Sequence, residues 1–149
     1  MDLIPPLESH LLDPVARHFA DQGYAVAAEM YYNHRLADVV AVKDGRVIAV
    51  ELKLRAWKGA LKQATAYQVT AHESYVALPL VVALPLLRRP SHFLKEGVGL
   101  LGVNHPHGDV RCLIPAGENK RLLPFAAERI RLAIEALMAE EPAEAAPQV

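Results

Sequence analysis

Apolar and polar residues repeat with two different periods along this chain of 149 residues. In residues 7–22 the apolar side chains recur every three or four positions, which predicts an amphipathic helix that Gly23 ends. Farther along, two apolar runs flank Asp44-Gly45, a dipeptide that strongly favours a tight hairpin turn. The strands expected in this half of the chain are residues 24–31, 36–42 and 46–54.

The pattern in the second half of the chain predicts further strands that join the same sheet. Residues 57–71 are expected to form a helix and residues 74–78 a short buried strand, so this order implies a right-handed parallel crossover. Residues 80–94 are ambiguous, with a short helix favoured after Pro90. The remaining elements are strands at 97–103 and 109–114 and a long amphipathic helix at 120–140.

These elements predict an α/β fold in which a mixed central β-sheet is flanked by α-helices. We expect one domain over residues 1–141 and a disordered C-terminal tail over residues 142–149. A hydrophobic share of 52% and a mean hydropathy of +0.12 exclude wholesale disorder. The longest apolar run, residues 75–87, is too short for a transmembrane helix, so no membrane partner is expected.

The start of the chain lacks the basic region and apolar stretch of a secretory signal, so we expect a cytoplasmic protein. The single cysteine, Cys112, excludes a disulfide within the chain, and its apolar surroundings predict that it is buried. No Gly-rich phosphate loop or dinucleotide fingerprint is present, so no nucleotide cofactor is expected. His105 and His107 flank Pro106 before a glycine, a pattern more typical of a polar turn than of a metal site.

Two carboxylates and a lysine gather at one end of the predicted hairpin. Side chains alternate along a strand, so Glu51 and Lys53 point to the same face. Pairing around the turn places Asp38 beside Glu51. Adjacent carboxylates repel unless a proton or cation separates them, and Mg²⁺ often takes one or two carboxylates while keeping several waters. A bound metal can activate water and polarise a phosphoryl oxygen, and Lys53 can stabilise the developing charge.

The order Asp38, Glu51, Leu52, Lys53 resembles the core motif of the PD-(D/E)xK nuclease superfamily, although Ala37 stands where the motif has its proline. The resemblance implies a restriction-endonuclease-like fold. It also implies an Mg²⁺- or Mn²⁺-dependent deoxyribonuclease that hydrolyses DNA phosphodiester bonds. In that family's terms Asp38, Glu51 and the Leu52 backbone carbonyl hold the metal, and Lys53 orients or activates the attacking water.

Two further features extend the resemblance to the RecB-like and Holliday-junction-resolvase-like branch. Gln63 and Tyr67 lie four residues apart on one helix and match the branch's Gln-x-x-x-Tyr pair, which implies that they position the DNA. Glu8, in the first helical segment, matches the helical glutamate that completes the metal site in many members. Taken alone, Gln63 and Tyr67 are equally well read as ordinary helix-surface residues.

The charge balance keeps a second hypothesis open. The chain has 16 Lys and Arg against 17 Asp and Glu, whereas DNA-binding domains usually have a clear basic excess. Acidic residues concentrate near the C-terminus. The basic residues near the candidate site are Lys43, Arg46, Lys53, Arg55, Lys58 and Lys62. The alternative is therefore a non-catalytic module of this fold that binds nucleic acid or protein in a larger assembly. For so small a domain, a homodimer is a further possibility.

Overall fold

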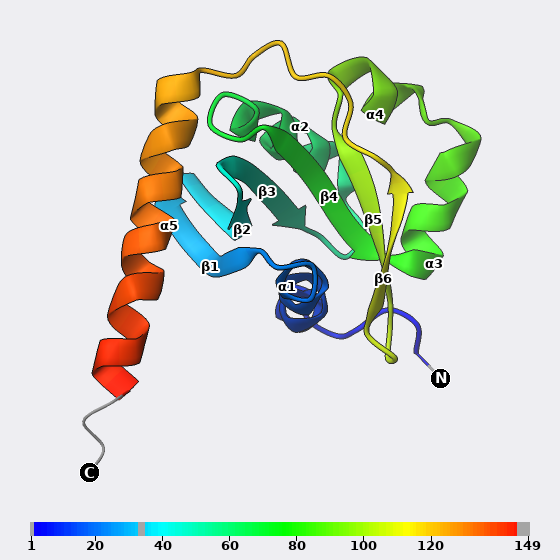
Figure 1. Ribbon diagram of the computed structural model, residues 1–149. Coiled ribbons are helices and arrows are strands. Elements are labelled where there is room, and N and C mark those ends of the chain that lie inside the picture. The colour runs from blue at the N-terminus through cyan, green and yellow to red at the C-terminus, as the bar shows by residue number, and fades with distance from the viewer. Residues whose placement is uncertain (1, 33–34, 146–149) are drawn as a thin grey trace.

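A six-stranded mixed sheet with the strand order β1-β2-β3-β4-β5-β6 forms the centre of the molecule (Figure 1). The computed structural model describes residues 2–32 and 35–145. Strands β3, β4 and β5 run parallel, and every other neighbouring pair is antiparallel. The strands are β1 (Ala25–Tyr32), β2 (Arg35–Lys43), β3 (Arg46–Leu52), β4 (Glu73–Pro79), β5 (Gly99–Asn104) and β6 (Asp109–Ile114). The predicted mixed sheet and its parallel crossover are confirmed.

The β2–β3 hairpin forms where the sequence predicts it. Asp44 and Gly45 both have positive φ, 50° and 80°, as the tight turn between twisted antiparallel strands requires. The turn fixes the register, which pairs Lys43 with Arg46 and continues to Val39 opposite Val50. The register therefore determines which residues meet at the far end of the hairpin.

Helices cover both faces of this sheet, with α1 on one side and α2 on the other (Figure 1). Ile48, Val50 and Leu52 of β3 pack toward α1, whereas Val47 and Ala49 pack toward α2. The helices are η1 (Glu8–Leu11), α1 (Leu12–Ala20), α2 (Trp57–Tyr67), α3 (Leu80–Ala83), η2 (Leu84–Arg88), α4 (Ser91–Glu96) and α5 (Pro124–Ala145). Among the described residues, no helix has both the length and the apolar composition needed to cross a membrane.

Several predicted boundaries differ from the structure. The first helix starts with the 3₁₀ turn η1, and α2 ends at Tyr67 rather than at residue 71. Helix α5 begins at Pro124 and continues through Pro142 to Ala145, so the expected tail at 142–149 is helical at its start. Residues 146–149 lie outside the described part.

Cys112 is exposed, and the prediction that it is buried is wrong. It lies on β6, an edge strand that pairs only with β5 within the sheet. Residues 109–113 are exposed or half-buried there, although the sequence around Cys112 is apolar. An apolar run does not distinguish an edge strand from a central one, because the position of a strand in the sheet depends on distant partners.

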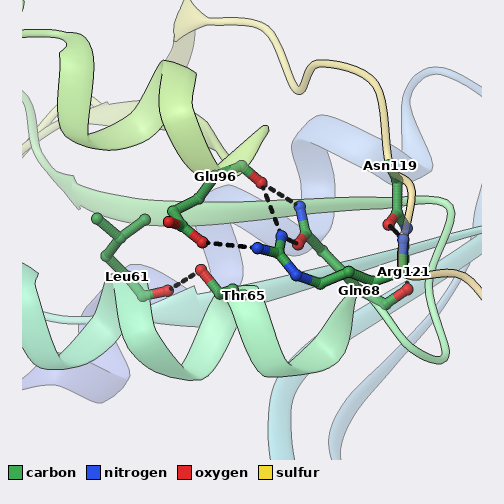
Figure 2. A network of polar contacts seen from close by, with 6 residues as sticks. All are labelled: Leu61, Thr65, Gln68, Glu96, Asn119 and Arg121. Carbon is green, nitrogen blue, oxygen red and sulfur yellow. Dashed lines mark hydrogen bonds and ion pairs between the residues drawn. The ribbon is translucent and has the colours of Figure 1, made fainter.

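A polar network ties the C-terminal end of α2 to α4 and to the segment before α5 (Figure 2). Gln68, 1% exposed, donates from Nε2 to the Glu96 carbonyl at 2.7 Å. Arg121 donates to the Gln68 side-chain oxygen and to the Glu96 carboxylate. Asn119 donates to the carbonyls of Gln68 and Ala71 at 2.9 and 2.7 Å. These bonds fix the end of the helix that carries Tyr67.

The substitution Asn119→Ala is expected to lower the free energy of unfolding by about 1–3 kcal/mol, because two main-chain carbonyls beside the buried Gln68 lose their donor. Urea unfolding measures this change. Asn104→Ala is the matched control, since the Asn104 side chain donates to Asp109 in an exposed contact at the end of the β5–β6 hairpin, and it should cost about 0.5 kcal/mol or less. Equal losses in the two variants would contradict a structural role for the network.

Candidate active site

At Asp38, a hydrogen bond to a side chain replaces the main-chain hydrogen bonds that pair β2 with β3. Regular pairing ends at Val39 opposite Val50. One step beyond, the Leu52 backbone N–H donates to Asp38 Oδ2 at 2.8 Å, so a carboxylate oxygen takes the place of a main-chain acceptor. This bond holds Asp38 against the end of β3, next to Glu51. The two carboxyl groups lie together, as the hairpin register predicts.

Glu51 is buried, with 6% of its surface exposed, on the side of β3 that α2 covers. The Tyr67 hydroxyl donates to Glu51 Oε1 at 2.9 Å. Side chains of a helix lean toward its N-terminus, which carries the Tyr67 ring from the end of α2 back to the level of Glu51. Tyr67 is itself only 7% exposed, so its hydroxyl is placed to orient Glu51 rather than to meet a substrate directly.

Burial and repulsion disfavour the charged form of this pair. The pKa of Glu51 is raised to about 7, first by burial and then by the negative charge of Asp38, while the Tyr67 hydrogen bond and Lys53 act in the opposite direction. Burial also raises the pKa of Asp38, against the lowering effect of the Leu52 N–H. The protonated Glu51 carboxyl donates a hydrogen bond to Asp38, which raises the pKa of Glu51 and lowers that of Asp38. Such a pair keeps a proton up to near-neutral pH unless a cation replaces it.

A pocket of about 240 Å³ opens beside Asp38 on the α1 side of the sheet. Its lining residues are Glu8, Ser9, Leu12, Glu29, Asp38 and Leu52. The 3₁₀ turn η1 brings Glu8 to this pocket, where Glu8 Oε2 lies 3.9 Å from Lys53 Nζ. Both side chains are partly exposed, so this ion pair is weak.

The structure thus gathers Asp38, Glu51, Lys53 and Glu8 at one end of β3. Gln63 lies one turn before Tyr67 on α2 and is exposed, whereas Tyr67 is buried. The two residues of the predicted Gln-x-x-x-Tyr pair therefore differ in burial. Among the described residues, no group of three or more His, Cys, Asp or Glu side chains is arranged as a ready metal site. The two touching carboxyls are therefore the core of the arrangement.

Glu29 is a pocket residue that the sequence analysis missed. It lies on β1 with a positive φ of 51°, lines the pocket with Asp38, and its charge contributes to the raised pKa of Asp38. The only signal in the sequence is a single glutamate in the apolar run Ala-Val-Ala-Ala-Glu-Met. That signal does not identify which strand lies beside Asp38.

Comparisons with protein-family models and with curated proteins found no match. Two solved structures are similar. A protein of unknown function from Silicibacter pomeroyi has a TM-score of 0.69 and 20% identity, over 92% of this chain and 90% of its own. An XisH family protein from Nostoc punctiforme has a TM-score of 0.53 and 17% identity, over 68% of this chain and 96% of its own. At such low identity the likeness concerns the fold, which is α/β and consistent with the restriction-endonuclease-like fold.

The raised pKa of Glu51 predicts a specific pH dependence of stability. Because the folded value of about 7 lies above the ordinary 4.5, the neutral carboxyl stabilises the fold fully below pH 4.5, and this contribution is lost as the pH rises through 7. We therefore expect the melting temperature of Glu51→Gln, measured without divalent metal, to rise relative to wild type across that window. A difference that stays constant with pH would contradict the raised pKa.

Removing the Tyr67 hydroxyl is expected to extend this pH window at its upper end. The hydroxyl donates to the Glu51 carboxylate and so favours its charged form. In Tyr67→Phe the pKa of Glu51 should rise further, so stability should still begin to fall near pH 4.5 but should continue to fall to a higher pH than in wild type. Melting curves across the pH series, compared with those of the double variant Tyr67→Phe/Glu51→Gln, measure the shift. The double variant lacks the Glu51 carboxyl and should not show this extension of the window.

Proposed function

We propose that this protein is a metal-dependent nuclease that hydrolyses DNA phosphodiester bonds. The observation that supports this most is the buried Glu51 carboxyl held against Asp38 at the end of β3, with Lys53 two residues farther on. A purely structural site has little reason to bury two adjoining carboxylates, and perturbed pKa values of this kind cluster at functional sites. The fold and the resemblance of the motif to PD-(D/E)xK nucleases point the same way.

The donor set fits Mg²⁺ or Mn²⁺. Both carboxylates offer oxygen ligands, and the proton that the pair retains marks a place where positive charge is favourable. Asp38 and Glu51 would hold the cation, with the Leu52 backbone carbonyl and Glu8 as further ligands. When bound, such a cation lowers the pKa of a coordinated water and polarises a phosphoryl oxygen.

The other side chains have supporting roles in this proposal. Tyr67 holds the Glu51 carboxylate through its hydroxyl, and the Leu52 N–H holds Asp38. Lys53 would exchange its weak pairing with Glu8 for contact with the attacking water or the phosphate, where a cation offsets developing negative charge. Gln63, exposed on α2, remains available to a phosphate or to the adjoining strand.

A second function is favoured by the internal neutralisation of the site. Asp38 and Glu51 share a proton and Lys53 lies near Glu8, so the charges are partly balanced without a metal. A non-catalytic module of this fold that binds nucleic acid or protein in a larger assembly would show the same arrangement. A measurement of metal binding distinguishes the two proposals, because only the nuclease requires a bound cation.

Cleavage tests the proposal directly. With Mn²⁺, wild-type protein is expected to cut at least one member of a panel of plasmid, linear, single-stranded and branched DNA. Lys53→Ala should lower the rate about 100-fold or more, the scale typical of losing a charge-stabilising group. Lys95→Ala, which removes an exposed lysine from α4, is the matched control and should keep the wild-type rate.

Calorimetry with Mn²⁺ completes the test, because Asp38→Asn and Glu51→Gln should abolish metal binding while circular dichroism shows an intact fold. A wild-type protein that neither cuts any substrate nor binds Mn²⁺ would refute the nuclease proposal and favour the binding module.

A further inference from the structure

Positive charge is concentrated in the segment that follows the candidate site. Residues 52–72 contain four Lys and Arg and no Asp or Glu, whereas the chain as a whole has a net charge of −1. Three of these cations, Arg55, Lys58 and Lys62, are exposed. We call these three residues the basic ridge.

Two residues of the basic ridge, Lys58 and Lys62, lie on the solvent side of the first half of α2, and Arg55 lies just before the helix. Lys58 and Lys62 are four residues apart and so share a helix face, with a rise of about 6 Å between them. The opposite face, with Ala60 and Ala64, packs on the sheet. Gly59 lies between Lys58 and Lys62 in the sequence. A Cβ built at Gly59 would meet no atom within 4 Å, so the surface of α2 is open at this point.

The cations of the basic ridge have no carboxylate partner among the described residues, a property that they share with other exposed cations such as Lys95, Lys120 and Arg129. Arg46 pairs with Glu73, Arg121 with Glu96, and Arg131 with two glutamates. Within the described ranges, Arg55, Lys58 and Lys62 form no salt bridge; Lys58 only approaches the Trp57 ring, at 5.7 Å from its centroid. Unpaired cations attract an anionic partner without first losing an internal one.

Near the site, the face of the sheet that α1 covers carries negative charge. Glu8 and Glu29 line the pocket beside Asp38, and Asp13 is exposed on α1. A phosphate backbone on that face would meet carboxylates, whereas one along α2 would meet lysine and arginine. The site therefore has an attractive side for one strand and a repulsive side for a second.

We propose that the basic ridge binds the phosphates of a single DNA strand and leads that strand to the candidate site, so the preferred substrate is single-stranded. This inference rests on the proposed nuclease function. Arg55 lies two residues beyond Lys53, which places the first cation of the basic ridge close to the site along the chain. Lys58 and Lys62 follow on α2.

The salt dependence of binding tests the proposal without requiring cleavage. Wild-type protein in EDTA is titrated into a labelled single-stranded oligonucleotide and into the matching blunt duplex, over a series of KCl concentrations. We expect the single strand to bind more tightly. Each phosphate contact contributes about 0.7 to the slope of log Kd against log salt for single strands, so Arg55→Ala/Lys58→Ala/Lys62→Ala should lower that slope by about 2.

Two further variants control for net charge and for folding. Lys95→Ala/Lys120→Ala/Arg129→Ala removes three exposed cations outside α2 and should keep the wild-type slope. Arg55→Lys/Lys58→Arg/Lys62→Arg conserves the charges and should also keep it. An unchanged slope in the Ala variant of the basic ridge, duplex binding as tight as single-strand binding, or no binding at low salt would each overturn this inference. The Mn²⁺ cleavage assay decides the nuclease function separately.

Discussion

The burial of Glu51 beside Asp38 is the constraint on which the rest of the site depends. Two carboxylates in a low-dielectric environment are stable only with a proton or a cation between them. The neighbouring groups all act on this pair: the Leu52 N–H on Asp38, the Tyr67 hydroxyl on Glu51, and Lys53 nearby. Each favours the ionised form without fully offsetting burial, which leaves the pair receptive to positive charge.

The fold holds this pair in place from both sides. The β2–β3 register places Asp38 at the end of β3, and α2 passes over the opposite face with Tyr67 in contact with Glu51. Because Gln68, Asn119 and Arg121 fix the end of α2, the hydroxyl of Tyr67 depends on contacts far from the carboxylates (Figure 2). The polar network thus supports the position of Tyr67 and, through the Tyr67 hydroxyl, the orientation of Glu51.

The near-neutral total charge conceals an uneven distribution. Lys58 and Lys62 lie on α2, which covers one face of the sheet, whereas Glu8 and Glu29 line the pocket on the α1 side. Net charge alone argues against a nucleic-acid partner, but a field at close range depends on which charges lie near the site and which of them are already paired. Here the basic ridge is unpaired with any described carboxylate, whereas Arg46, Arg121 and Arg131 are paired.

The sequence by itself determined the hairpin and the meeting of Asp38 with Glu51, because a two-residue turn and the strand period fix these through local geometry. It also determined the parallel crossover, because a helix connects two successive strands. It did not determine the burial of Tyr67 relative to Gln63, the approach of Glu29 to Asp38, the exposure of Cys112 or the length of α5. Only the tertiary structure decided these, because each depends on which distant element packs against the residue, and local periodicity contains no information about that neighbour.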